Sequence, residues 1–194
     1  AFLNDKSRQN GAEHDRFRAF SVDGVKTPSF FENGEALLYA VDNKLFRRDL
    51  NAEESVLLFE SNAPIDFAAE FNTTAAPICF CSSSAVLYTA PDGALNAVSL
   101  SRNPKTITFA PAGRLPAYHQ ASRRTAYING DQIVIAGSVP CAFSVDGVKT
   151  PSFFENGEAL LYAVDNKLFR RDLNAEESVL LFESNAPIDF AAEL

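Results

Sequence analysis

A stretch of 52 residues occurs twice in this chain without a single change. Residues 19–70 read the same as residues 142–193, displaced by 123 positions. A repeat of this length constrains the architecture before any local pattern is read, because each copy must bury its apolar face against a neighbouring unit. Since repeats diverge as they settle into different surroundings, we interpret the identity as an engineered duplication first, and as a young natural tandem duplication second.

The local pattern from residue 19 onward is one of short apolar runs separated by turn residues, which is typical of an all-β protein. Similar strands recur around four tyrosines, and each strand leads through a polar turn into another strand: Tyr39, Tyr88, Tyr127 and Tyr162. The turns D-N-K, P-D-G and N-G-D contain residues that tolerate the backbone of tight hairpins. We expect these tyrosines to form the core together with four phenylalanines: Phe30, Phe59, Phe109 and Phe143.

The period of 123 residues divides into three units of four short strands, averaging 41 residues. Four strands in roughly 40–45 residues is the spacing of a β-propeller blade. The run T-P-S-F-F-E-N-G-E-A-L-L-Y-A-V-D-N-K-L-F-R-R-D-L at 27–50 resembles a blade of the WD-repeat family or of a related propeller family. The chain has neither a Trp-Asp dipeptide nor a Gly-His pair. The resemblance implies four-stranded antiparallel blades arranged as in a propeller.

The predicted organisation is a polar arm at 1–18 followed by a repeat domain of about four blades at 19–194. The blades are expected near 28–61, 64–111, 116–145 and 151–184. Single strands at 19–24 and 187–192 are then left over, and unpaired strand edges need a cover. Either one chain closes four blades alone, or two chains pair these edges, and we favour the homodimer. A sandwich of two packed sheets is the alternative fold, because short strands give similar patterns in both.

The charge and hydropathy of the chain exclude several classes of partner. A net charge of −8 disfavours binding to nucleic acid or to anionic lipid. No apolar run reaches the roughly 18–20 residues that a membrane span needs. Arginine pairs are spread along the chain among acids, and we interpret them as solvated positions: Arg16 with Arg18, Arg47 with Arg48, Arg123 with Arg124, and Arg170 with Arg171.

The three cysteines, Cys79, Cys81 and Cys141, do not form an even disulfide framework. Two of them are two residues apart in a predicted strand and face the same side, which suits neither a disulfide nor a four-ligand zinc site. We therefore expect reduced, buried thiols. Reduced thiols favour an intracellular location, although the compartment itself is not predicted.

The sequence predicts no catalytic, cofactor-binding or metal-binding residue. His14 and His119 lie in unlike contexts, and a structural role is the favoured interpretation of His119. No nucleophile elbow, P-loop or H-E-x-x-H motif is present. Whether the protein is an enzyme is left open, with the balance toward a non-enzymatic role.

Two classes of function follow. The first is a non-enzymatic interaction or scaffold module that binds a protein or peptide through loops on one propeller face. The second is a propeller that binds or hydrolyses glycans, with polar loop residues acting around a central channel. The residues available for the second function are Asp23, Asp42, Asp92 and Arg114.

Overall fold

The computed structural model of the chain describes residues 2–5, 16–19, 22–31, 34–65 and 78–188. Within these ranges the backbone is built mainly from strands, and the helical content is confined to 3-10 turns, at η3 (Glu155–Gly157) and at its counterpart Gly34. The all-β prediction is confirmed, because the described strands fall into several four-stranded antiparallel sheets.

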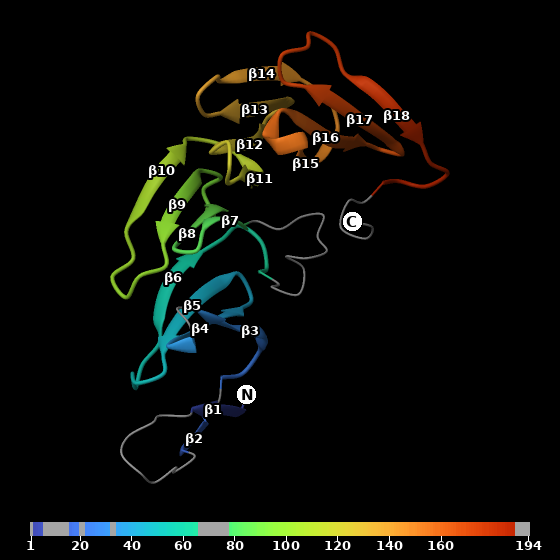
Figure 1. The fold of residues 1–194 in the computed structure, drawn as a ribbon. Helices are drawn as coiled ribbons and strands as arrows, with labels where there is room; N and C mark the ends of the chain where they lie inside the picture. Colours follow the sequence, from blue (N-terminus) through green and yellow to red (C-terminus); the bar gives the residue numbers. More distant parts are fainter. Residues whose placement is uncertain (1, 6–15, 20–21, 32–33, 66–77, 189–194) are drawn as a thin grey trace.

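Four sheets of four antiparallel strands follow one another along the chain (Figure 1). Blade I contains β3 (Val25–Phe31), β4 (Ala36–Val41), β5 (Lys44–Asp49) and β6 (Val56–Glu60). Blade II contains β7 (Ile78–Ser82), β8 (Ala85–Thr89), β9 (Leu95–Ser99) and β10 (Thr106–Ala110). Blade III contains β11 (Arg114–His119), β12 (Arg124–Asn129), β13 (Gln132–Ala136) and β14 (Cys141–Ser144). Blade IV contains β15 (Val148–Phe154), β16 (Ala159–Val164), β17 (Lys167–Asp172) and β18 (Val179–Glu183).

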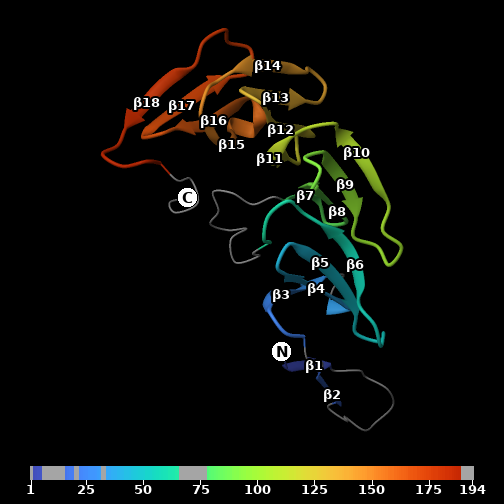
Figure 2. The same cartoon turned by 180° about the vertical axis from the view of Figure 1, so that it is seen from behind.

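The blades are arranged along a curve, with blade I and blade IV at its opposite ends (Figures 1 and 2). The first strands lie on the inner side, since β11 lies beside both β7 and β15. The fourth strands form the outer edges. This serial arrangement of separate sheets is propeller-like, and it differs from a sandwich, in which two sheets would share one core.

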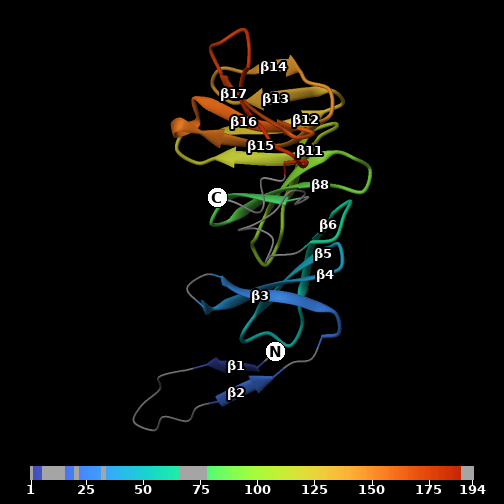
Figure 3. The same cartoon turned by 90° about the vertical axis from the view of Figure 1, so that its right-hand side faces the viewer.

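A two-stranded sheet continues the series beyond blade I (Figure 3). It pairs β1 (Phe2–Asp5) with β2 (Arg16–Ala19), so the described ends of the predicted polar arm are strands. Ala19 pairs with Phe2 in this sheet. Its counterpart Ala142 instead lies in β14 and pairs with β13. Equivalent positions of the two copies therefore pair with different strands, depending on which strand lies beside them.

The core consists of apolar layers between consecutive blades. Leu38, Leu45 and Phe59 of blade I pack with Tyr88 and Val98 of blade II. Equivalent layers lie between blades II and III and between blades III and IV. Strand β4 is apolar without alternation, and Ala36–Ala40 are buried throughout, as expected of a strand covered on both faces.

The four tyrosines at the predicted core positions are all buried. Phe59 is buried and Phe143 packs against the layer between blades III and IV, but the other two phenylalanines were wrongly assigned to the core. Phe30 is 57% exposed and Phe109 is 39% exposed. Phe109 lies on the outer strand β10, where its ring contacts Tyr127 edge-on. Phe30 lies on blade I, which follows the two-stranded sheet of β1 and β2 and not a four-stranded blade, whereas its counterpart Phe153 meets the His119 ring of the preceding blade.

Three strand assignments need correction. The blade expected from residue 64 has β7 as the first strand of its sheet: Ile65 is not in a strand, donates its N–H to the Asp42 carbonyl oxygen (2.8 Å) and is fully buried. Residues 22–24 form no strand. Residues 187 and 188 are not in a strand either, and the rest of the predicted strand at 187–192 lies outside the described residues.

Candidate functional site

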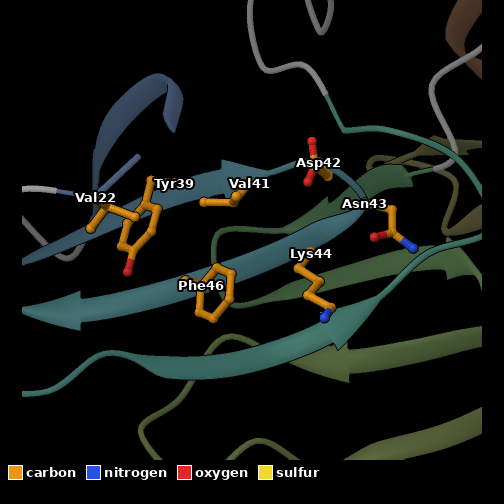
Figure 4. Close-up of a pocket in the computed structure, with 7 residues that line it drawn as sticks. All are labelled: Val22, Tyr39, Val41, Asp42, Asn43, Lys44 and Phe46. Carbon is orange, nitrogen blue, oxygen red and sulfur yellow. The ribbon is translucent and has the colours of Figure 1, made fainter. Parts of the chain in front are cut away.

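A shallow hollow of about 370 Å³ lies beside the β4–β5 hairpin of blade I (Figure 4). Tyr39 and Phe46, from neighbouring strands, form its aromatic wall, and their rings are stacked with centroids 5.3 Å apart. The polar side comes from Asp42 and Asn43 in the two-residue turn and from Lys44 after it. The sequence folds this way because Val41 pairs with Lys44, and Asp42 adopts the positive φ of 52° that a tight turn requires.

The second copy contains the same hollow, with a volume of about 440 Å³. Tyr162 and Phe169 stack with centroids 5.5 Å apart, as their counterparts do in blade I. Ser144, the last residue of β14, and Asp146, in the connection between blades III and IV, add to its wall. The local sequence is therefore enough to create the hollow, and the neighbouring blade changes its size.

The turn asparagine of each hollow is already engaged in holding the blade together. The Asn43 side-chain nitrogen donates to the Ser61 carbonyl oxygen (2.9 Å) and to Glu60 Oε1 (3.1 Å). In blade IV, Asn166 donates to the Ser184 carbonyl oxygen (2.8 Å). These bonds fasten the turn to the end of the outer strand, and Lys44 Nζ lies 4.0 Å from Glu60 Oε2 in an exposed ion pair. The Asp42 carboxylate is then the polar group most available to a ligand in blade I.

The four residues considered for glycan chemistry are not assembled into one site. Asp42 lines the blade I hollow, while Asp23 lies in an exposed turn. Asp92 Oδ1 accepts a hydrogen bond from the Ala94 N–H (3.0 Å), which is a turn-forming role. Arg114 is exposed on β11. In the part of the chain that the structure describes, no hydrogen bond or ion pair joins any two of the four.

The histidine and cysteine positions have structural surroundings. His119 Nδ1 lies 2.8 Å from Ser122 Oγ, and its ring is 5.9 Å from that of Phe153. His14 lies outside the described residues. None of the three cysteines is in a disulfide, and all three are half-buried, not fully buried as the sequence suggested. Burial raises the pKa of the Cys81 thiol, with a smaller opposing effect of a backbone hydrogen bond. The described residues contain no group of three or more potential metal ligands.

The most unusual surface lies on β18, the outer strand of blade IV. We use the name β18 face for Leu181 and Phe182, which are exposed by 47% and 51%. Val179 and Leu180, before them on the strand, are exposed by 61% and 47%, and their blade I counterparts Val56 and Leu57 are exposed too, by 36% and 45%. Apolar side chains in such a run are more exposed than is usual for a monomer, and adjoining patches of this kind mark interaction sites.

The first copy shows the same residues in a covered state. Leu58 and Phe59 correspond to Leu181 and Phe182, and both are only 5% exposed. The Phe59 ring stacks on Tyr88 of blade II, with centroids 4.1 Å apart. Blade II thus covers in blade I the surface that is open in blade IV.

Polar contacts also hold blade I to blade II. Arg47, which the sequence had suggested as solvated, is 4% exposed. Its Nη1 donates to the Leu100 carbonyl oxygen (2.6 Å), and its Nη2 pairs with Asp49 Oδ1 (2.7 Å). Arg102 of blade II contacts the other oxygen of Asp49. Arg47 is buried because blade II supplies a carbonyl acceptor, which a single-strand pattern does not reveal.

Sequence reasoning found neither the hollows nor the β18 face. The hollow had a signal, since a two-residue turn at Asp42 and Asn43 places Tyr39 directly opposite Phe46. The β18 face had none, because its residues are identical to those of β6.

Comparisons with known proteins identify the fold alone. No family model matches the chain, and no curated protein matches it in sequence. Among solved structures, 141 chains match. One of them belongs to a structure described as "Crystal Structure of Mitotic Checkpoint Complex", with 11% sequence identity and a TM-score of 0.51 over 93% of this chain. This chain spans 62% of the length of that one.

No described helix has the length and apolar character needed to cross a membrane.

Proposed function

We propose that the protein is a non-enzymatic interaction module that binds a protein partner through the β18 face. The observation that carries this proposal is the contrast between Phe182, 51% exposed, and Phe59, 5% exposed, at identical positions of the two copies. A face that is packed in one copy has the shape and apolar character to be packed in the other. A further support is that the similar solved chain belongs to a structure described as a complex.

A photo-crosslinking experiment tests this proposal. Benzoylphenylalanine replaces Phe182 in the full chain, and the matched control carries it at Phe30, which is 57% exposed on blade I. In an extract of the cells from which the protein comes, the first chain is expected to give a discrete conjugate. Unlabelled wild-type chain should compete for it, and Phe182→Asp chain should not. Conjugates of equal yield at both positions, or at neither, would contradict the proposal.

Self-association is the form of interaction that the sequence suggested, through strands at 19–24 and 187–192. The described part of the first strand is already engaged, because Ala19 pairs with Phe2 in the same chain. We therefore place the contact between two copies on the β18 face instead, where apolar side chains are open and where it competes with the contact between blades I and II of the same chain.

Glycan binding is a second candidate, and the duplicated hollow favours it. Each hollow combines an aromatic wall with a carboxylate, Asp42 in blade I and Asp165 in blade IV. Sugar rings pack on aromatic side chains while carboxylates accept bonds from their hydroxyl groups. Binding on a glycan array that is lost in the double variant Asp42→Asn/Asp165→Asn would support this function. An array signal that the double variant retains, or no signal at all, would count against it.

A further inference from the structure

We infer that the β18 face binds blade II of a second copy of this chain, in the manner in which blade II covers blade I. The inference rests on the proposed function and names its partner. Blade II carries the groups that match this surface: Tyr88, which stacks on Phe59, and Val86, Val98 and Leu100, which belong to the same apolar layer. Because the sequence of blade IV is that of blade I, these groups meet the same chemistry in either copy.

The backbone of blade IV already has the form that this contact needs. Tyr162 pairs with Phe169 and Leu168 pairs with Phe182, as Tyr39 pairs with Phe46 and Leu45 with Phe59. The irregularity in the ladder to the outer strand also falls at the same place in both blades. A preformed surface binds without the cost of ordering it first.

The polar pair at the edge of this surface is preformed as well. Arg170 Nη2 lies 2.8 Å from Asp172 Oδ1, as Arg47 Nη2 lies 2.7 Å from Asp49 Oδ1. In blade I this arginine also donates to the Leu100 carbonyl oxygen, and Asp49 also contacts Arg102. A second chain would bring its own Leu100 carbonyl and its own Arg102 to blade IV. The contact is therefore complementary in charge as well as in apolar shape.

Competition within the chain controls this association. Each chain has one blade II and two equal surfaces for it, on blade I and on blade IV. Blade I is close to blade II along the chain, so its effective concentration there is high, and it holds blade II in the intact molecule. Exchange between intact chains replaces one contact by an equal one and gains no buried surface. The chain should therefore associate through the β18 face when blade I is weakened.

The contact joins two different surfaces, so it is heterologous. Two chains can close it reciprocally, with each blade IV on the blade II of the other chain, and a larger number can form a ring or an open chain. In each of these assemblies the mass exceeds that of the 21.1 kDa monomer by a factor of two or more.

Three variants of the full chain test the inference by light scattering. Phe59→Asp damages the surface of blade I, Phe182→Asp damages the β18 face, and the third variant carries both changes. We expect Phe59→Asp to at least double in mass with rising concentration, while the wild type, Phe182→Asp and the double variant stay monomeric. A Phe59→Asp chain that retains its β-sheet circular dichroism and remains monomeric would overturn the inference. Association of the double variant to the same extent would overturn it too.

If Phe59→Asp does not fold, a milder substitution in the same surface tests the inference. Leu58→Ala removes less from the same surface, where Leu58 is 5% exposed, and its counterpart Leu181→Ala is the control. Leu58→Ala should raise the mass and Leu181→Ala should not, and the reverse order would contradict the inference. The Phe59→Asp and Leu58→Ala chains could stay monomeric while position 182 crosslinks specifically to an unrelated protein. That result would support the interaction function and reject a second copy of this chain as the partner.

Discussion

The ring of Phe59 stacks on that of Tyr88 with centroids 4.1 Å apart and planes 20° from parallel. This contact joins blade I to blade II, and the counterpart of Phe59 in blade IV, Phe182, is 51% exposed. Two copies of one sequence thus stand in two environments within one molecule. A substitution in one copy therefore has a control of identical local sequence in the other.

Substitution of Leu38 and of Leu161 should have unequal effects. Leu38, on β4, is 3% exposed in the layer between blades I and II. Leu161, on the corresponding strand β16 of blade IV, is half-buried. Leu38→Ala is expected to lower the free energy of unfolding by about 2–5 kcal/mol, because it leaves a cavity. Leu161→Ala should cost less than half as much. Denaturant unfolding of the two variants measures the difference, and equal losses would show that both copies have equivalent surroundings.

The buried guanidinium of Arg47 gives a second matched pair with Arg170. Arg47 is 4% exposed and donates hydrogen bonds to Asp49 and to the Leu100 carbonyl oxygen. Arg47→Ala therefore leaves the buried Asp49 carboxylate without this ion-pair partner. The expected loss of stability is about 3–5 kcal/mol. The Arg170 side chain is 30% exposed and Asp172 is 56% exposed, so Arg170→Ala should cost about 0–1 kcal/mol. Thermal or chemical unfolding would refute this if Arg170→Ala were the more destabilised variant.

Gly34 and Gly157 form a third pair, which tests the contact between blades III and IV. Both have positive φ, 90° and 80°, so alanine is strained at both positions to a similar extent. A Cβ at Gly157 would also overlap the His119 ring and the Ser122 hydroxyl, while one at Gly34 would meet no atom within 4 Å. Gly157→Ala should therefore be less stable than Gly34→Ala by about 1–3 kcal/mol. Equal stability of the two alanine variants would place blade IV away from His119.

The Cys81 thiol should react slowly with alkylating reagents at neutral pH. Burial raises the pKa of this thiol, and the thiolate is the nucleophile, so alkylation should become fast only at a pH above the ordinary thiol range. The folded chain holds this proton more tightly than the unfolded chain does. The stability contributed by the thiol is therefore full at low pH and falls as the pH rises above the ordinary thiol pKa. Mass spectrometry after timed alkylation would contradict this if Cys81 reacted like a peptide thiol.

Local patterns were enough to predict the strands and much of the core. Alternation and turn residues depend on neighbours a few positions away, so the hairpin at Asp42 and the buried tyrosines followed from them. The start of blade II did not follow: the blade was expected from residue 64 but its first strand is β7, because an apolar residue such as Ile65 can be buried outside a strand. The burial of Arg47 depends on the Leu100 carbonyl, 53 positions away in sequence. Such acceptors are invisible to a short window.

The open β18 face shows the limit of sequence reasoning most clearly. Phe59 and Phe182 have the same neighbours for many residues on both sides, so no local rule assigns them different burial. What separates them is whether another blade lies against the outer strand. The candidate interaction surface is thus a property of the arrangement of blades.

Tryptophan fluorescence can measure the difference in burial between positions 59 and 182. The chain has no tryptophan, so Phe59→Trp and Phe182→Trp each introduce a single reporter. In dilute solution, tryptophan at position 59 should emit at shorter wavelength and resist quenching by acrylamide, because blade II covers it. Tryptophan at position 182 should emit near the wavelength of free indole in water and be readily quenched. Matching spectra and matching quenching at the two positions would contradict the account.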